Sequence, residues 1–320
     1  MTSTSIPEAL HHLIDPSAEF ELLGQGYLFS EGPAWNDHTG ELIFHDIPGD
    51  SRWRWTESLG TELLQTPDFK VSGAVFEPDG SLLVCEQVTS SVVRIRPDGA
   101  RELAAYHYEG KYLNSPNDIV TRSDGSIYFT DPNYGRWPVA VGVGRECELD
   151  FQGVFRVPPG GGPLQLVVER GEFEQPNGLC FSPDERTMYI DDRTNLKAFE
   201  VADDGSLVNG RTIAEGMGSV DIPGTGNPDG MKVDELGNVW CTARDGIWIF
   251  SPEEKLLGIV PVPEVSGNLV WGGPELRTLF VTMTTGLYRI ETKVRSCRLP
   301  YHRADRWTAR PYDARRESGA

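Results

Sequence analysis

The chain repeats one pattern six times, and this repeat constrains its fold more than any other feature. Each repeat contains a short run rich in apolar, aromatic and β-branched residues, as expected of a buried strand. The runs are LIFHD (42–46), LLVCE (82–86), IYFTD (127–131), MYIDD (188–192), VWCTA (239–243) and LFVTM (279–283). Their spacings are about 40, 45, 61, 51 and 40 residues. Spacings near 40 residues are typical of four-stranded propeller blades, and the longer ones indicate insertions.

Turn residues and further apolar stretches flank these runs. Asp79-Gly80 and Asp124-Gly125 precede two of them, and a stretch such as Ala74-Val75-Phe76 lies upstream of the turn. This arrangement predicts a hairpin, and a third strand is expected after the run, as at residues 92–95. The 35 glycines and 23 prolines also suit many short strands with turns between them. We therefore predict an all-β fold, a six-bladed β-propeller with four-stranded antiparallel blades around a central channel.

The shared repeat also defines the domain organisation. Because two independent domains would not share one repeat, residues 1–320 are predicted to form a single domain, with the repeats over about residues 20–291. Residues 1–19 form a short N-terminal segment, where a helix at residues 7–14 is expected as a brace. Residues 292–320 form a tail with eight Lys/Arg against three Asp/Glu, and its order and role stay open.

Both ends of the repeat region are expected to meet. The last strand, near residues 287–290, should pair with residues 20–23, since closure of the ring removes exposed sheet edges. One of the two longer intervals contains an insertion at residues 137–150, which we expect to cover an end of the propeller. Arg136 and Arg145 would then belong to a lid over the site. The alternative is that the insertion forms a contact with another protein.

Charge and cysteine usage narrow the classes of function. A net charge of −19 gives no broad electrostatic footprint for nucleic acid, and no apolar run approaches the ~20 residues of a membrane-spanning helix. The start, MTSTSIP, has neither the basic nor the apolar region of a secretory signal. The five cysteines form no C-x-x-C pair, so a zinc knot or disulfide framework is poorly supported and a reducing cytoplasm is expected. No nucleic-acid or membrane partner is expected, and a homo-oligomer stays open.

One position in each repeat is predicted to converge on the channel. Counting back 14 or 15 residues from the end of each apolar run reaches the start of an inner strand. The residues at this position are Glu31, Ser72, Asn117, Asn177, Asp229 and Asn268. Because the innermost strands of a propeller line its channel, equivalent positions should form a ring around the axis. We call these six residues the oxygen ring, since all six side chains carry oxygen.

The composition of the oxygen ring favours a metal site. Buried carboxylates are costly unless they are paired or bound to metal, and no Lys or Arg occupies an equivalent position. One divalent cation is expected, with Ca²⁺ favoured and Mg²⁺ or Mn²⁺ also suitable. Zn²⁺ is less favoured because the ring has no His or Cys. The alternative is that Asn-Gly and Asp-Gly pairs only form turns, but turn propensity does not explain Glu31 or the shared register.

Several motifs, taken in order, resemble the gluconolactonase / regucalcin (senescence marker protein) family of six-bladed propeller lactonases. They are SEGPAW (30–35), SPNDIV (115–120), YFTDPNYG (128–135), QPNGL (175–179) and PDGMKVD (228–234). The likeness runs from about residue 23 to residue 290, with no blade missing. It implies one catalytic divalent cation held by Glu31, Asn177 and Asp229, with Asn117 on the metal or the substrate. It also implies hydrolysis of a sugar lactone, although some relatives cleave phosphotriesters.

The sequence departs from the sugar-lactonase pattern in two places. Many such enzymes follow the Cys-Glu of the second repeat with His-Gly and a basic stretch, whereas this chain has Gln87-Val88-Thr89. The substitution puts gluconolactone itself in doubt and allows a less polar lactone or ester. His45 stands where a small residue is common in the family, and it is a candidate substrate contact. As a lone histidine, it is more often a packed or surface group.

The ring residues suggest roles in a hydrolytic reaction. Asp229 is the only Asp of the ring and the best candidate general base, while direct attack by Asp229 is less favoured. Glu31 would be a structural metal ligand, and Asn117 and Asn177 would supply amide oxygens. Candidate substrate-binding or supporting residues are Asn117, Ser72, Asn268, Glu86, Asp131 and His45. Asp118 should point to the opposite face of its strand.

Three functions remain from the sequence. The first is a metal-dependent lactonase acting on a small-molecule lactone. The second is a phosphotriesterase-type hydrolase on the same metal site. The third is a non-enzymatic calcium-binding propeller, which would bind metal in the ring but have no substrate pocket above it.

Overall fold

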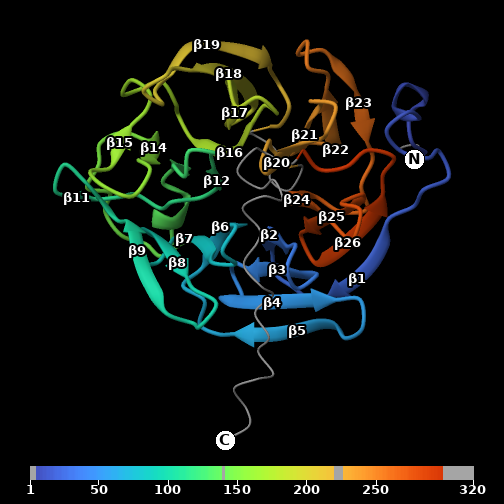
Figure 1. The fold of residues 1–320 in the computed structure, drawn as a ribbon, viewed down its shortest axis with the longest axis horizontal. Coiled ribbons are helices and arrows are strands. Elements are labelled where there is room, and N and C mark those ends of the chain that lie inside the picture. Colours follow the sequence, from blue (N-terminus) through green and yellow to red (C-terminus); the bar gives the residue numbers. More distant parts are fainter. Residues whose placement is uncertain (1–4, 139–140, 220–225, 298–320) are drawn as a thin grey trace, which may run out of the picture.

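The strands of the chain form a closed ring of six sheets. The computed structural model describes residues 5–138, 141–219 and 226–297. Six four-stranded antiparallel sheets surround one axis as blades (Figure 1), which confirms the predicted six-bladed propeller. In the first five blades the strands lie from the axis outward in chain order.

The first three blades contain the longest insertion. The first consists of β2 (Ser30–Asn36), β3 (Glu41–Asp46), β4 (Ser51–Thr56) and β5 (Gly60–Gln65). The second consists of β6 (Val71–Phe76), β7 (Leu82–Glu86), β8 (Ser91–Ile95) and β9 (Arg101–Ala105). The third consists of β12 (Ile119–Thr121), β13 (Ile127–Asp131), β14 (Gly153–Val157) and β15 (Gln165–Leu166). A small hairpin, β10 (His107–Tyr108) and β11 (Lys111–Tyr112), lies between the second and third blades, and the 3₁₀ helix η2 (Tyr134–Arg136) follows β13.

The last three blades bring the two ends of the repeat region together. The fourth consists of β16 (Pro176–Phe181), β17 (Thr187–Asp192), β18 (Asn195–Val201) and β19 (Leu207–Ala214). The fifth consists of β20 (Met231–Val233), β21 (Val239–Ala243), β22 (Gly246–Phe250) and β23 (Leu256–Val260). The sixth consists of β24 (Ser266–Gly272), β25 (Thr278–Met283), β26 (Gly286–Glu291) and β1 (Glu21–Gln25).

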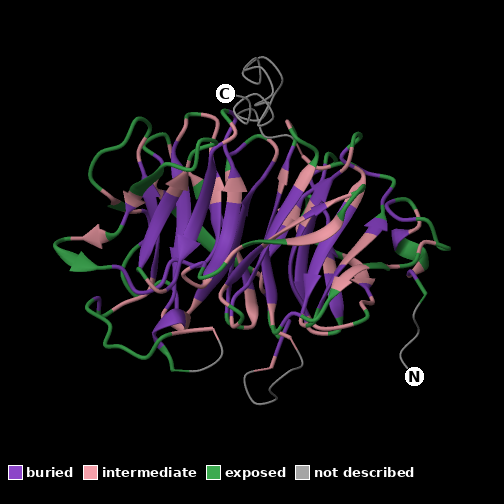
Figure 2. Cartoon of the chain, turned by 90° about the horizontal axis from the view of Figure 1, so that it is seen from below, coloured by how far each residue is buried: buried purple, intermediate pink, exposed green. Residues whose placement is uncertain are grey.

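The six apolar runs form the second strand of each blade, as predicted. Every residue of β7, β13 and β21 is buried, and Figure 2 shows that buried residues dominate the inner strands. A middle strand is covered on both faces by neighbouring blades. Its sequence is therefore mostly apolar and does not alternate between apolar and polar residues.

The ring closes through the N-terminal strand. β1 pairs antiparallel with β26, with Glu21 opposite Arg289 and Gln25 opposite Gly286. The predicted pairing is therefore confirmed. Ser30 reinforces the junction, since its hydroxyl donates to the carbonyl of Met283 at 2.6 Å. Closure leaves the inner strands of all six blades flanked by a neighbour.

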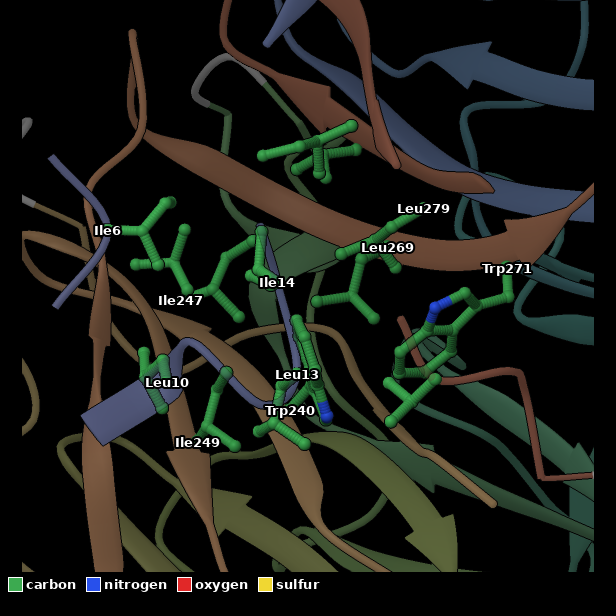
Figure 3. Close-up of a cluster of buried hydrophobic side chains, with 14 of the residues drawn as sticks. Ile6, Leu10, Leu13, Ile14, Trp240, Ile247, Ile249, Leu269, Trp271 and Leu279 are labelled. Atoms are coloured by element: carbon green, nitrogen blue, oxygen red, sulfur yellow. The ribbon is translucent and has the colours of Figure 1, made fainter. Parts of the chain in front are cut away.

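The segment before β1 packs against the fifth and sixth blades. The expected helix at residues 7–14 is one 3₁₀ turn, η1 (Glu8–Leu10), because Ile14 leaves the helical path to form a β-bridge with Thr292. Leu10, Leu13 and Ile14 are fully buried in a cluster with Trp240 and Trp271 from the two blades (Figure 3). The segment thus braces the propeller, as expected from the sequence.

Four other sequence expectations concern the insertion, the membrane spans, the cysteines and the C-terminal tail. The insertion at residues 137–150 connects β13 to β14. Among the described residues, no helix is long and apolar enough to span a membrane, and none of the five cysteines forms a disulfide. Within the tail, residues 292–297 are described, and the expectations for residues 298–320 lie outside the described part of the chain.

We predict that the N-terminal brace contributes strongly to stability. Leu13→Ala should lower the free energy of unfolding by about 2–5 kcal/mol, because the substitution leaves a cavity between two blades. Leu103→Ala, on the exposed edge strand β9, should change it by less than about 0.5 kcal/mol. Urea unfolding followed by tryptophan fluorescence measures both values, and equal losses would contradict a bracing role.

Candidate functional site

The oxygen ring lies where neighbouring inner strands approach most closely. Glycine follows the ring residue in four blades, as Gly32, Gly73, Gly178 and Gly230. A Cβ atom added to Gly32 would lie 1.9 Å from the carbonyl oxygen of Ser72, and one on Gly178 would lie 1.9 Å from that of Asp229. Neither position has room for a side chain. Backbone packing therefore fixes the positions directly before these two glycines, which are Glu31 and Asn177.

Glu31 is a buried carboxylate with one oxygen free. Its Oε2 accepts a hydrogen bond from the amide of Gly32 at 2.5 Å, whereas Oε1 has no hydrogen-bond partner. Burial is the main cause that raises the pKa of Glu31, to about 8, and the nearby charge of Asp118 adds to the rise. As long as no cation is bound to it, Glu31 is thus predominantly protonated at neutral pH.

Asp229 and Asn177 form the opposite part of the ring. Asp229 is half-buried at the end of the loop before β20. Burial raises the pKa of Asp229 well above its usual value, and the charges of Glu31 and Asp191 raise it further. A hydrogen bond from the side chain of Asn177 opposes this rise. The amide oxygen of Asn177 has no hydrogen-bond partner.

These atoms meet the requirements of a hard divalent cation. The carboxylates of Glu31 and Asp229 repel each other inside the protein. The free oxygens of Glu31 and Asn177 accept no hydrogen bond. A cation with oxygen ligands removes both costs. In the described part of the chain, no group of three or more His, Cys, Asp or Glu side chains could hold a metal ion by itself. A cation site here therefore depends on the amides of Asn177 and Asn117.

The remaining ring residues serve partly as scaffold. Asn117 and Ser72 are buried, and the carbonyl of Asn117 accepts a hydrogen bond from Gly73 at 2.6 Å, which joins the second and third blades. The amide oxygen of Asn268 accepts from Leu269 at 2.9 Å. Interactions with the side chain of Asn268 also lower the pKa of Glu31 and of Asp118. The oxygen of Asn268 is therefore used inside the protein.

Asp118 faces the channel, contrary to the sequence expectation. β12 begins only at Ile119, so strand alternation does not yet determine the direction of the preceding side chain. Its carboxylate accepts hydrogen bonds from Ile119 at 2.8 Å and Leu179 at 3.4 Å. Burial raises the pKa of Asp118, and the charge of Lys232 opposes the rise. Asp118 thus adds a third carboxylate next to the ring.

A second set of side chains lies behind the oxygen ring, at the penultimate residue of each apolar run. These residues are His45, Cys85, Thr130, Asp191, Thr242 and Thr282. The Thr130 hydroxyl donates to the carbonyl of Asn177 at 2.6 Å, and the Thr242 hydroxyl donates to that of Gly267 at 2.6 Å. These threonines therefore fasten the inner strand of the next blade. Sequence reasoning did not recognise these six residues as a set, although they occupy the same position in each repeat.

Asp191 is the carboxylate of this second set. It is fully buried, and its Oδ2 accepts a hydrogen bond from Gly178 at 2.8 Å while Oδ1 has no partner. Burial raises its pKa well above the usual value. Asp191 lies behind Asn177 and Asp229 and contributes to the raised pKa of Asp229. Asp191 therefore supports the site from behind. Three other repeats have threonine at the equivalent position.

His45 takes part in a buried network between the first two blades. Its Nδ1 lies 2.6 Å from Oδ2 of Asp68, and Arg52 donates to Oδ1 of Asp68 at 2.6 Å. Burial lowers the pKa of His45, and Nε2 has no hydrogen-bond partner. The network joins β3 and β4 to the loop before β6. Contact between His45 and substrate stays a prediction, now for a residue with a clear structural role.

Glu86 and Asp131 already have partners in the protein. Glu86 pairs with Arg101 and accepts from the Thr89 hydroxyl at 2.8 Å. Asp131 accepts from the backbone amides of Asn114 and Ser115, both at 2.8 Å, and burial raises its pKa to about 7. Asp131 therefore shapes the loop that leads to the ring. A direct substrate contact by Glu86 or Asp131 stays a prediction.

The insertion after β13 is fastened to the body by its arginines. Arg136 donates to the carbonyls of Leu113 and Asn114, and Arg145 donates to that of Gln87 and to the hydroxyl of Ser90. Both guanidinium groups thus have backbone partners over the second and third blades. The structure therefore gives them an anchoring role and not that of cations free to bind a substrate.

The same insertion places aromatic side chains near the site. Tyr134 is half-buried and lies edge-on to the exposed Trp137, with ring centroids 5.7 Å apart. Burial raises the pKa of Tyr134, and the charges of Asp191 and Asp229 raise it further. Tyr134 belongs to a motif quoted from the sequence, but sequence reasoning gave it no role.

Comparisons with known proteins identify the family of the chain. The model of the SMP-30/Gluconolactonase/LRE-like region matches residues 29–285. The chain is 29% identical to a gluconolactonase of Zymomonas mobilis, over 91% of this chain and 86% of that protein. It is 24% identical to regucalcin of Xenopus laevis, over 82% and 85% of the two chains.

Solved structures show the same architecture. A gluconolactonase of Xanthomonas campestris superposes with a TM-score of 0.80 at 32% identity, covering 90% of this chain and 94% of that chain. A calcium-binding regucalcin from Agrobacterium tumefaciens shares the fold, with a TM-score of 0.69 at 17% identity over 90% and 98% of the chains.

The raised pKa of Glu31 predicts a pH-dependent stability when no cation is bound. Between its unfolded value of 4.5 and its folded value of about 8, Glu31 holds a proton only in the folded chain. The free energy of unfolding should therefore fall as pH rises through this window. Urea unfolding in chelator at several pH values measures the slope. The slope should be shallower in Glu31→Gln, and an identical slope in both proteins would refute the assignment.

Proposed function

Because the chain belongs to the SMP-30/gluconolactonase/LRE-like family, we propose that it is a lactonase that uses one divalent cation. Glu31, Asn177 and Asp229 would hold the cation, with Asn117 beside them. The observation that carries this proposal is the pair of free, buried oxygens on Glu31 and Asn177, facing a site with two carboxylates. Ca²⁺ is the preferred ion, because all these ligands are oxygens and the amides are neutral.

The proposed reaction is attack of water on the lactone carbonyl. When bound, the cation polarises the carbonyl and offsets the negative charge around Asp229. Asp229 accepts the proton of the attacking water as the water oxygen bonds to the carbonyl carbon. The ring C–O bond then breaks, and the leaving oxygen takes up a proton to give a hydroxy acid. Asp229 suits this role because it is half-buried, whereas Glu31 is buried out of reach of bulk water.

The surroundings favour a neutral lactone. Asp118, Asp191 and Asp229 give the site a negative character, and the guanidinium groups of Arg136 and Arg145 donate to main-chain carbonyls. Tyr134 and Trp137 add an aromatic surface. A sugar lactone without a charged substituent, or a related cyclic ester, fits these features better than an anionic lactone.

Substitution of the base should abolish turnover. Asp229→Asn is expected to reduce kcat by about 10²–10⁴-fold, since the proton of the attacking water loses its acceptor. Hydrolysis is followed by pH-stat on sugar γ- and δ-lactones, aliphatic lactones and one phosphotriester, in chelator and after addition of Ca²⁺, Mg²⁺, Mn²⁺ or Zn²⁺. Asp203→Asn, in an exposed turn between β18 and β19, is the control and should keep full activity.

Each outcome of this panel has a distinct meaning. Metal-dependent turnover of a lactone supports the proposal and ranks the substrates. Turnover of the phosphotriester alone would favour the second hydrolase function. Cation binding without any turnover would favour a calcium-binding propeller, and full lactonase activity in cation-free Asp229→Asn would overturn the mechanism.

Substitution of Glu31 should act mainly on the cation. Glu31→Gln removes one of two ring charges and should weaken Ca²⁺ binding by at least about tenfold. Isothermal titration calorimetry measures the affinity. Glu19→Gln, on the exposed N-terminal segment, is the matched control and should bind Ca²⁺ as the wild type does. An unchanged affinity in Glu31→Gln would exclude Glu31 as a ligand.

A further inference from the structure

The channel continues past the oxygen ring into an apolar cavity. The cavity has a volume of ≈150 Å³ and is lined by residues from the inner strands of all six blades. Half-buried wall residues include Trp35, Val75, Val120 and Val270. Among the described residues that line the cavity, Lys232 is the only cation. Asp37 is the other charged wall residue. A lysine in the wall of an apolar cavity needs a physical reason.

The shape of the lysine side chain supplies this reason. Lys232 lies on the short inner strand β20, three residues after Asp229. Its methylene stem belongs to the apolar wall, and its ammonium donates to the carbonyl of Met231 at 3.0 Å and lies 3.5 Å from the amide oxygen of Asn268. Lysine side chains bury their stem in apolar surroundings while the ammonium reaches polar groups. Here the ammonium reaches the oxygen ring from below.

The ammonium of Lys232 lies on the oxygen side of the Asn268 amide. The oxygen of Asn268 faces Lys232 and the backbone amide of Leu269, so its NH₂ group is left to donate to carboxylates. Interactions with this side chain lower the pKa of Glu31 and of Asp118, so both carboxyl groups lie beside it. Lys232 thus contacts one ring residue directly and Glu31 through it.

We propose that Lys232 is a positioning residue of the cation site, which orients the Asn268 amide and places a fixed positive charge beneath the oxygen ring. This inference rests on the proposed cation site. The fixed charge repels a bound cation in proportion to the charge of that cation. It therefore limits the affinity of the ring and disfavours trivalent ions relative to divalent ones. Asp118, in the same part of the channel, has the opposite effect.

The test measures cation affinity and not activity. Calorimetry with Ca²⁺ and luminescence with Tb³⁺ are applied to the full chain and to Lys232→Gln, in which an amide keeps a polar end on a similar stem. Ca²⁺ affinity should rise about tenfold. The rise should be larger for Tb³⁺. The logarithm of the fold-increase for Tb³⁺, divided by that for Ca²⁺, should be close to the ratio of the two ionic charges. Lys232→Arg keeps the charge and should bind both ions as the wild type does.

Two further variants complete the design. Asp118→Asn should lower both affinities, and the double variant Asp118→Asn/Lys232→Gln should return them close to the wild-type values. Lys255→Gln, in an exposed turn before β23, is the control for loss of a lysine charge and should change neither affinity. Urea unfolding of each variant checks that the propeller is intact. If Lys232→Gln does not fold, Lys232→Arg and Asp118→Asn decide the question.

The outcomes separate this inference from the proposed function. Unchanged or lower affinities in folded Lys232→Gln, or a higher affinity in Asp118→Asn, would overturn the role of Lys232. A wild-type protein that binds neither ion would overturn the cation site together with the inference. Cation binding with the expected shifts but without lactone turnover would support Lys232 and refute only the lactonase function.

Discussion

The close approach of neighbouring inner strands at the axis is the constraint on which the site depends. At Gly32 and Gly178 the next blade's backbone occupies the space of a side chain. Blades that meet in this way leave little freedom to the residue just before each glycine. Glu31 and Asn177 are therefore placed by main-chain packing and not by their own contacts. If these residues hold an ion, a ring placed in this way needs little reorganisation when the ion arrives.

Rigid placement has an electrostatic cost in this molecule. Glu31, Asp118, Asp191 and Asp229 are brought into one region, and burial raises the pKa of each carboxyl group. Stability alone would favour neutral residues at these places. The retention of four acidic groups at the narrowest part of the fold is understandable if a positive charge is bound there. Lys232 offsets part of the negative charge from the opposite side.

Much of the fold could be predicted from the sequence, because the repeat is carried by local signals. Apolar runs and turns located six second strands, and the pairing of residues 20–23 with 287–290 followed from the need to close the ring. Helix η1 was predicted too long, since the tertiary bridge between Ile14 and Thr292 ends it. At the site, the register of the repeat brought Glu31 to the axis as expected. The direction of Asp118 was misread, because it depends on where a short strand begins. Lys232 was missed, because its position depends on a cavity that no local pattern reveals.

The closing pair of strands has a consequence for how the protein is made. β1 leaves the ribosome first, but its partner β26 is among the last elements to be synthesised. Until then the growing chain carries an unpaired N-terminal strand and an open set of blades, both of which expose edges that other chains can join. The brace of Leu10, Leu13 and Ile14 likewise has no blade to cover until the fifth and sixth are complete. Biosynthesis of this propeller therefore ends in one late closing step, which makes the nascent chain a natural client for chaperones.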